Sequence, residues 1–284
     1  MFRSYIAGAL NSDAVGYIKN LNRMIVHSEM IRRMGVAVFV PGIDCLVGIT
    51  MGDLEYNDYF DNSQPWLDAS DFMYVVPHWG KSKGTQNEIV RAYGKNIPVL
   101  FTTEEVKKFI RPHVICIIGE SGSGKSVIAD LLQLRDYYLI CSYTTRPRRH
   151  PNESGHTFLS PEQFDALNRD AMIAYTEFGG NRYCCLEKDV QTKNTYVIDD
   201  RGYEYLKKTY SDIYNIFAVR IKTDENVRAQ FVDKERMERD KTMFFLPDSE
   251  YDMIIQNDYD ARNLYQTTQD IVKTSITKFS AQCL

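Results

Sequence analysis

Residues 119–126 read Gly-Glu-Ser-Gly-Ser-Gly-Lys-Ser and match the pattern G-x-x-x-x-G-K-[ST] in full. An apolar strand is expected before them, at 114–118, and a helix after them, at 127–134. Such a loop turns its backbone N–H groups inward at a helix N-terminus, where they hold phosphate oxygens. We expect Lys125 to reach the β- and γ-phosphates of a nucleoside triphosphate and Ser126 to bind Mg²⁺. The residues expected to contact this nucleotide are Gly119, Ser121, Gly122, Ser123, Gly124, Lys125 and Ser126.

Arginines follow this loop in a short segment, 142–149, which reads Ser-Tyr-Thr-Thr-Arg-Pro-Arg-Arg. A monophosphate is a dianion, and the forked guanidinium group binds its oxygens bidentately. Arg146 and Arg149 could therefore hold the phosphate of an acceptor. The alternative is that both arginines form ordinary surface salt bridges.

The segment 142–149 resembles the S-x-T-T-R-x-x-R signature of the guanylate kinases. Four further elements appear in that family's order, at 153–158, 178–183, 197–202 and 251–258. With the phosphate loop they cover nearly all of the chain from residue 112 to residue 284. The resemblance implies a kinase that uses ATP and Mg²⁺ to phosphorylate a nucleoside monophosphate.

The resemblance also assigns site residues. Those implied to bind the acceptor are Ser142, Arg146, Arg149, Tyr183 and Asp199. Arg228, Arg236 and Arg239 fall where the family has its mobile lid arginines, so Arg236 and Arg239 join Lys125 as catalytic candidates. The alternative for Arg236 and Arg239 is a solvated helix face, because residues 233–240 are charged almost throughout.

The sequence departs from the guanylate kinases where that family reads its base. Ala174 stands at the position of the guanine-contacting glutamate, and Cys184 and Cys185 replace the small or hydroxyl residues after Tyr183. A carboxylate is the natural acceptor for the N–H donors of guanine, so its loss weakens selectivity for that base. Asp199 could still read one donor, and Glu177 is expected one helical turn from Ala174. The preferred base is left open.

The first half of the chain carries a second set of residues. Tyr5-Ile6-Ala7-Gly8, the apolar run 71–76, the segment 79–88 and Ala92 together resemble the nucleoside 2-deoxyribosyltransferase-like superfamily, which includes 2′-deoxynucleoside 5′-phosphate N-hydrolases. The resemblance implies that Glu88 attacks the anomeric carbon of a deoxyribose. A carboxylate suits an oxocarbenium-like transition state. Ser82 would contact a 5′-phosphate, and Tyr5 and Gly8 would form the floor near the sugar.

This first site also departs from the family. Ser63 stands where an aspartate is usual, although a small insertion could bring Asp61 into place. Without it the domain could bind a nucleotide and not cleave it. The alternative for Glu88 is a carboxylate placed in the first helical turn for the helix dipole alone. His78 and Trp79 could contact a base, or His78 could simply pack in its loop.

The elements that must position these residues alternate between strand and helix. Strands are expected at 4–8, 36–40, 72–76, 97–101 and 114–118, with helices at 13–34, 85–93 and 127–134. Residues 42–62 are poorly periodic and are expected to form a loop with some helix. This alternation predicts an α/β protein with two domains, each a mostly parallel sheet flanked by helices. We expect a Rossmann-like domain at 1–110 and a P-loop kinase domain at 111–284.

Composition limits the classes of function. The formal net charge is −4, and no long basic run occurs, which argues against nucleic acid and anionic membranes as partners. The longest apolar runs fall far short of the ~20 residues of a membrane span. The six cysteines form no Cys-x-x-Cys pair, which favours a reducing, cytoplasmic compartment. Small-molecule nucleotides are the expected partners, and a homo-oligomer is compatible with the sequence.

The sequence therefore predicts a bifunctional enzyme of nucleotide metabolism. The second domain would phosphorylate a (deoxy)nucleoside monophosphate, and the first would hydrolyse or exchange the N-glycosidic bond of a deoxynucleoside or its monophosphate. The alternative is a nucleotide-binding or interaction protein in which one or both domains are not catalytic. The intact Lys125 argues against that alternative, because a pure binding module does not need the lysine of the loop.

Overall fold

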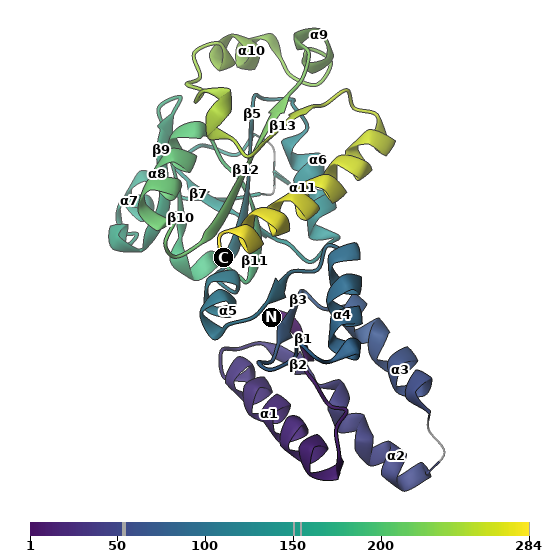
Figure 1. The fold of residues 1–284 in the computed structure, drawn as a ribbon. Coiled ribbons are helices and arrows are strands. Elements are labelled where there is room, and N and C mark those ends of the chain that lie inside the picture. Colours follow the sequence, from purple (N-terminus) through teal and green to yellow (C-terminus); the bar gives the residue numbers. More distant parts are fainter. Residues whose placement is uncertain (53–54, 150, 154, 284) are drawn as a thin grey trace. The chain divides into compact units, whose positions relative to one another are not determined.

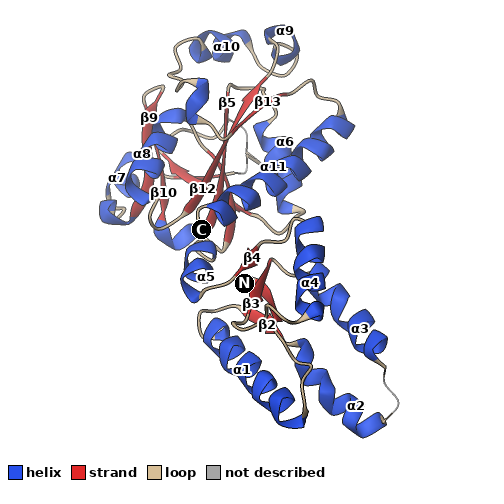
Figure 2. Cartoon of the chain, in the orientation of Figure 1, coloured by secondary structure: helices blue, strands red, loops and turns tan. Residues whose placement is uncertain are grey.

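The computed structural model describes residues 1–52, 55–149, 151–153 and 155–283. The chain divides into two compact units (Figure 1). Unit 1 comprises Met1–Ile110 and the chain from Ile276 onward, and unit 2 comprises Arg111–Ser275. The α/β class is confirmed, because the main sheet of each unit is parallel and flanked by helices (Figure 2).

The sheet of unit 1 has four parallel strands in the order β2-β1-β3-β4. They are β1 (Arg3–Ala7), β2 (Ala37–Phe39), β3 (Phe72–Val75) and β4 (Val99–Leu100). Parallel neighbours need crossover connections, and helices supply them. The helices of this unit are α1 (Ala14–Arg32), α2 (Cys45–Met51), α3 (Tyr56–Asp68), α4 (Lys83–Gly94) and α5 (Thr103–Phe109).

Successive side chains of β1 face opposite sides of this sheet, as the period of a strand requires. Tyr5 and Ala7 belong to a buried cluster with Leu67 of α3 and Ile89 of α4. The register pairs Tyr5 with Phe39 on one side and with Met73 on the other. Tyr5 therefore lies on the central strand and faces the helices that carry the other candidate residues of unit 1.

The segment 42–62 is more regular than its sequence suggests. A 3₁₀ turn at Pro41–Asp44 leads into α2, and α3 then runs on to Asp68. The backbone N–H of Glu55 donates to the Asp58 carboxylate at 2.7 Å, which caps the start of α3. Two of the side chains that α3 buries, Ser63 and Gln64, are polar. An apolar repeat is therefore missing although the helix has a buried face, which is why the segment holds more helix than the expected loop with some helix.

Unit 2 is built on a five-stranded parallel sheet in the order β13-β12-β5-β11-β6. Its strands are β5 (His113–Gly119), β6 (Tyr138–Ile140), β11 (Lys193–Val197), β12 (Asn215–Lys222) and β13 (Met253–Gln256). The central strand β5 is buried over its whole length, and it ends where the phosphate loop begins. Helices α6 (Lys125–Gln133), α8 (Asp200–Tyr210) and α11 (Ala261–Ala281) are the long helices around this sheet (Figure 1).

A second sheet of unit 2 has the order β8-β7-β10-β9, in which β10 runs antiparallel to both of its neighbours. Its strands are β7 (Ser142–Thr144), β8 (His156–Phe158), β9 (Met172–Phe178) and β10 (Asn181–Leu186). The short helices α7 (Pro161–Asp165), α9 (Glu225–Arg228) and α10 (Lys234–Asp240) complete the unit. Of the residues implied to bind the acceptor, Ser142 and Tyr183 lie in this small sheet, and Arg146 and Arg149 lie between its strands β7 and β8. The phosphate loop belongs to the large sheet.

Candidate functional site

The phosphate loop joins β5 to α6, as its sequence pattern requires. Gly122 and Gly124 have backbone φ angles of 71° and 92°, which are accessible to glycine at little cost. A Cβ atom on Gly124 would lie 2.3 Å from the Asn257 amide nitrogen, and one on Gly122 would lie 2.4 Å from Val232. The loop therefore needs glycine at these positions both for its conformation and for its close neighbours.

The carbonyl oxygens of the loop are held from outside. The Asn257 amide donates to the Ser123 carbonyl at 2.9 Å, and the Thr223 hydroxyl donates to it at 3.3 Å. The Nε of Arg228 donates to the Ser121 carbonyl at 2.9 Å. The Tyr259 hydroxyl donates to the Gly122 carbonyl. Because these carbonyls are satisfied on the outer side, the loop is held in one defined conformation.

Lys125 starts α6 and turns back over the loop. Its Nζ donates to the carbonyls of Gly119 at 2.7 Å and Glu120 at 2.6 Å. Burial lowers the pKa of Lys125 to about 8, and although the Asp240 carboxylate opposes this effect, the charges of Arg236, Arg228 and Arg220 add to it. The lysine is thus surrounded by other cations, a situation that favours binding of a multiply charged anion. Ser126 lies in the first turn of α6 with its side chain exposed.

The lid arginines do not lie on a uniformly solvated face. Lys234 and Glu238 of α10 are exposed, but Arg236 and Arg239 are half-buried. The guanidinium of Arg239 lies 4.9 Å from the centre of the Phe178 ring and donates to the Ser121 hydroxyl at 3.1 Å. Arg236 and Arg239 are thus partly shielded from solvent, and their role at a lid stays a prediction.

Arg228 behaves differently from these two. Besides its bond to the Ser121 carbonyl, it forms an ion pair with Glu120 at 2.7 Å, and its side chain is almost fully buried. Arg228 is thus a fixed part of the phosphate loop's surroundings.

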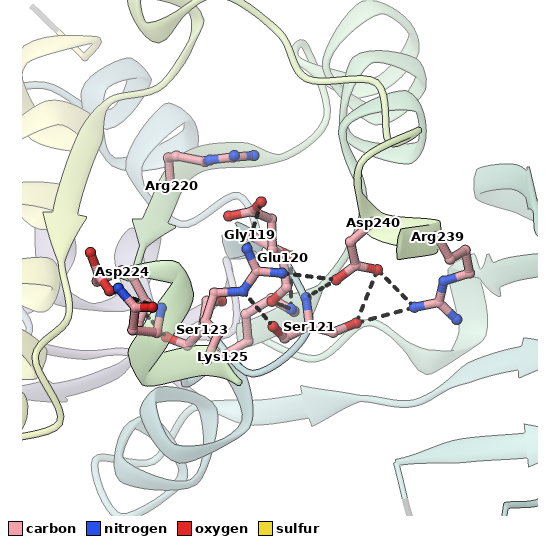
Figure 3. A network of polar contacts seen from close by, with 12 residues as sticks. Gly119, Glu120, Ser121, Ser123, Lys125, Arg220, Asp224, Arg239 and Asp240 are labelled. Carbon is pink, nitrogen blue, oxygen red and sulfur yellow. Dashed lines mark hydrogen bonds and ion pairs between the residues drawn. The ribbon is translucent and has the colours of Figure 1, made fainter. Parts of the chain in front are cut away.

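Asp240, the last residue of α10, is a site residue that the sequence pattern does not reveal. Its carboxylate accepts a hydrogen bond from the backbone N–H of Ser121 at 2.7 Å, and Figure 3 shows it between Ser121 and Arg239. The side chain is 1% exposed. An aspartate in a charged run gives no signal of burial, because most such residues face solvent.

The two acceptor arginines share one carboxylate. Arg146 pairs with Glu153 at 2.7 Å, and both side chains are only 9% exposed. Arg149 lies 3.5 Å from the same carboxylate and also donates its backbone N–H to it. Although burial opposes the effect, these hydrogen bonds hold the pKa of Glu153 at about 2. Glu153 therefore orients both guanidinium groups, a role that the sequence did not assign to it.

The other implied acceptor residues lie around these arginines with partners of their own. Tyr183 is close enough to Arg146 to affect its pKa, and its ring meets His156 edge-on at 6.0 Å between ring centres. The buried hydroxyl of Ser142 donates to the Tyr196 hydroxyl at 3.2 Å. Burial and the charges of Arg236 and Arg146 lower the pKa of Arg149. The cations expected at the acceptor and at the lid thus lie within electrostatic reach of one another.

A pocket opens between three parts of unit 2. Its lining includes Glu177 on β9, Asp199 at the start of α8, Arg239 on α10, and Phe244. Asp199 caps α8 by accepting from the Gly202 N–H at 2.8 Å, and it also accepts from the Thr176 hydroxyl at 2.8 Å. An acceptor nucleotide placed here would meet the lid on one side and the small sheet on the other.

The positions that depart from the guanylate kinases are apolar and buried. Ala174 and Cys185 face each other across β9 and β10 and belong to the core of unit 2. Glu177 lies on β9 and not on a helix, so the expected one-turn spacing from Ala174 was wrong. In a strand these two residues point to opposite faces. Glu177 accepts from the Tyr175 hydroxyl and is exposed. The polar residues that line the neighbouring pocket include Glu177, Asp199, Asp200, Arg201 and Thr242.

In unit 1 the structure brings Tyr5 and Glu88 together. The Tyr5 hydroxyl donates to a carboxylate oxygen of Glu88 at 2.6 Å. Burial raises the pKa of Glu88 to about 7, although the hydrogen bond from Tyr5 opposes this effect. Burial and the charge of Glu88 raise the pKa of Tyr5. Glu88 lies in the second turn of α4, beyond the first turn, and its main partner is a tyrosine on the central strand.

The remaining candidates of unit 1 have structural partners. Ser82 caps α4, where its Oγ accepts from the Thr85 N–H at 3.3 Å. Gly8 follows β1, and a side chain there would crowd Met24. Ser63 is buried and interacts with the Tyr5 hydroxyl, whereas Asp61 is exposed. The insertion that would bring Asp61 into the site is thus not present.

The two aromatic candidates of unit 1 differ. Trp79 packs on Phe101 and against the buried cluster of Tyr5. His78 is exposed, with a φ of 71°. Trp79 is therefore part of the packing, and His78 is the more accessible of the two to a ligand.

The described residues also bear on metal sites and membrane spans. Among the described residues, no group of three or more His, Cys, Asp or Glu side chains is placed to hold a metal ion. A Mg²⁺ ion that accompanies a nucleotide needs only one or two protein ligands, because phosphates and water supply the rest, and the exposed Ser126 hydroxyl fits that need. No helix in the described part of the chain is long and apolar enough to cross a membrane.

Comparisons with known proteins give one family match, and it falls within unit 1. Residues 2–101 match the family described as "Domain of unknown function (DUF4406)". Among solved structures, the chain is similar to guanylate kinase from Anaplasma phagocytophilum, with 19% identity and a TM-score of 0.45 over 61% of this chain and 88% of that chain. It is also similar to a sugar kinase from a Janibacter species, with 13% identity and a TM-score of 0.34 over 58% of this chain and 98% of that chain. No curated protein matches the sequence.

The raised pKa of Glu88 predicts how the stability of unit 1 depends on pH. The folded chain holds the Glu88 proton more tightly than the unfolded chain, so this group lowers stability as pH rises from about 4.5 to about 7. We expect Glu88→Gln to remove this loss and to be more stable than wild type by about 3 kcal/mol above pH 7, and by little below pH 4.5. Both tryptophans, Trp66 and Trp79, belong to unit 1, so tryptophan fluorescence during urea unfolding of the full chain reports on this unit.

The matched control is Glu104→Gln, which changes an exposed carboxylate of unit 1 in the same way. Its stability relative to wild type should vary little between pH 5 and pH 8. A Glu88→Gln difference that stays constant over this range would show that the carboxylate is not protonated by burial.

Proposed function

We propose that unit 2 transfers the terminal phosphoryl group of ATP to a nucleoside monophosphate. The observation that carries the proposal is the position of Arg239. It donates to the Ser121 hydroxyl of the phosphate loop at 3.1 Å, and it also lines the pocket that contains Asp199. One arginine of α10 thus lies beside both the expected donor site and the expected acceptor site, as phosphoryl transfer between two bound nucleotides requires.

The contacts of each residue indicate its role in the proposed transfer. The loop N–H groups and Lys125 would hold the phosphates of ATP, and Ser126 would contribute a ligand to the accompanying Mg²⁺. Arg146 and Arg149, oriented by Glu153, would bind the acceptor phosphate. An oxygen of the acceptor phosphate would attack the terminal phosphorus of ATP as the bond to the departing ADP breaks. Arg236 and Arg239 would neutralise the negative charge on the group in transfer and exclude water.

The acceptor base would lie in the pocket bordered by Asp199 and Phe244. Both oxygens of Asp199 already accept hydrogen bonds, from Gly202 and Thr176. The apolar pair Ala174 and Cys185 offers a base no hydrogen bond acceptor of the carboxylate kind. These features support a kinase with a broader choice of base than a guanylate kinase.

For unit 1 we infer cleavage or exchange of the N-glycosidic bond of a deoxynucleoside or its 5′-monophosphate. The supporting observation is the hydrogen bond between Tyr5 and Glu88, which holds the carboxylate in a defined orientation. Ionised Glu88 would attack the anomeric carbon, the bond to the base would break, and water or a second base would then release the sugar. With a pKa of about 7, Glu88 is ionised to a useful extent only near and above neutral pH.

Lys125→Ala tests the donor site. Removal of the cation at the loop should lower the rate of ADP formation by at least about 100-fold, the scale for losing one preorganised electrostatic contact in a transition state. The measurement is ADP release with each common NMP and dNMP in the presence of Mg²⁺. Lys208→Ala, an exposed lysine of α8, is the matched control and should retain wild-type turnover. Turnover of Lys125→Ala close to wild type would refute the assignment of the loop.

Base preference tests the acceptor pocket. Because Ala174 stands in place of a carboxylate, we expect kcat/KM for GMP or dGMP to exceed that for other monophosphates by less than ~10⁴, the discrimination that a dedicated polar site supplies. Steady-state comparison of the full panel gives the ratio. A larger advantage for guanine would mean that Glu177 or Asp199 reads the base, and Glu177→Gln and Asp199→Asn would then identify which.

Glu88→Gln tests the first site. The amide keeps the size of the side chain but is a poor nucleophile, so release or exchange of base should be lost. Free base is detected by chromatography after incubation with each deoxynucleoside and dNMP, with and without an acceptor base. Glu104→Gln should behave as wild type, and both variants should keep their kinase activity because Lys125 and its partners belong to unit 2. If wild type releases no base with any of these substrates, unit 1 is a binding module.

A further inference from the structure

The strongest unexplained feature of unit 2 is a buried carboxylate at the phosphate loop. Both oxygens of Asp240 contact Ser121. One accepts from its backbone N–H at 2.7 Å, and the other accepts from its hydroxyl at 3.2 Å. The side chain is 1% exposed. Backbone N–H groups of such loops are the donors that hold phosphate oxygens, and here one of them is bound to an anion from the protein itself.

The surroundings of Asp240 are those of a bound anion. Arg239 donates to its carboxylate at 2.9 Å (Figure 3). Arg228 lies 3.4 Å from the same carboxylate. Although burial alone would raise the pKa of Asp240, hydrogen bonds from Arg239 and Ser121 lower it, so the group remains charged. A carboxylate is stable in such a buried place only while these partners are present.

The cationic side chains near this carboxylate carry more hydrogen bond donors than its two oxygens satisfy. Within the described residues, the buried Nε atoms of Arg236 and Arg239 have no hydrogen bond partner. Lys125 meanwhile donates to the carbonyls of Gly119 and Glu120 and not to an anion. One carboxylate therefore stands in a site with enough donors and charge for a larger anion.

The position of Asp240 connects this contact to the lid. Asp240 ends α10, a short helix whose Lys234, Glu235 and Glu238 are exposed. Just before this helix, Val232 lies close to Gly122. A Cβ atom added to Gly122 would lie 2.4 Å from the Val232 side chain. The segment 232–240 is thus attached to the phosphate loop at both of its ends.

We propose that Asp240 is an internal occupant of the phosphate site, which holds α10 on the loop until the polyphosphate of a nucleotide displaces it. The proposal rests on the phosphate-binding part of the proposed function. The carboxylate and the incoming phosphate compete for the Ser121 N–H and for Arg239. Phosphate binding must therefore first release Asp240 from the loop. The apparent affinity for the polyphosphate is then the intrinsic affinity multiplied by the fraction of molecules in which Asp240 has left the loop.

The test compares binding of inorganic tripolyphosphate and of ATP with Mg²⁺ to the full chain by calorimetry. Asp240→Ala should bind tripolyphosphate at least about tenfold more tightly than wild type, which corresponds to ~1.4 kcal/mol. Glu238→Ala removes an equal charge from the same helix, where Glu238 pairs only with Lys241 in the described contacts, and should change affinity less than about twofold. Asp240→Asn, which keeps the size and one acceptor oxygen, should give an intermediate gain and serves if the alanine variant does not fold.

The outcomes separate this proposal from the proposed function. If wild type binds tripolyphosphate and neither Asp240 variant binds it more tightly, Asp240 only supports the binding arginines. The proposal that Asp240 occupies the phosphate site is then refuted, while the kinase proposal stands. If the Asp240 variants bind tripolyphosphate more tightly but no form of the protein phosphorylates any monophosphate, the proposal for Asp240 stands and the proposed phosphoryl transfer fails. If no form binds tripolyphosphate or ATP, both proposals fall.

Discussion

The phosphate site of unit 2 depends on the way its loop is held from outside. Asn257, Thr223, Arg228 and Tyr259 all bind loop carbonyls, and all four lie about 100 residues or more beyond the loop in the sequence. A glycine-rich loop alone has many conformations, and these contacts select one of them. The parallel sheet makes the contacts available, because β12 pairs directly with β5 and with β13. The fold thus fixes the loop before any ligand is bound.

The same contacts explain why this region concentrates positive charge. Arg228 is needed to hold the loop, and it adds its charge to those of Lys125, Arg220 and Arg236. Arg220 lies 3.5 Å from the centre of the Phe245 ring and 3.6 Å from Asp200, so its charge is only partly compensated. Such a cluster is costly without anions. Glu153 pairs with Arg146, and Asp240 pairs with Arg228, so each supplies a carboxylate to this region.

Features that are local in sequence were predictable, and features that depend on distant partners were not. The loop at 119–126 and the strands around it follow from a pattern read over a few residues. The strand and helix that carry Tyr5 and Glu88 were also expected, but the hydrogen bond between these two residues joins positions 83 apart. Asp240 gave no signal, because a carboxylate among charged neighbours is usually exposed. Glu153 opened one of the recognised elements, at 153–158, but its pairing with Arg146 and Arg149 was not expected. Glu177 was placed on a helix because β9 lacks the alternation of a half-buried strand, its first residues being buried on both faces.

The charge of Arg236 acts on both Lys125 and Arg149, which has a thermodynamic consequence if two anions bind near these residues. An anion bound at one set of cations would neutralise part of the repulsion that the other set experiences. The affinity for a second anion would then increase, and reciprocity requires that each ligand strengthen the other by the same factor.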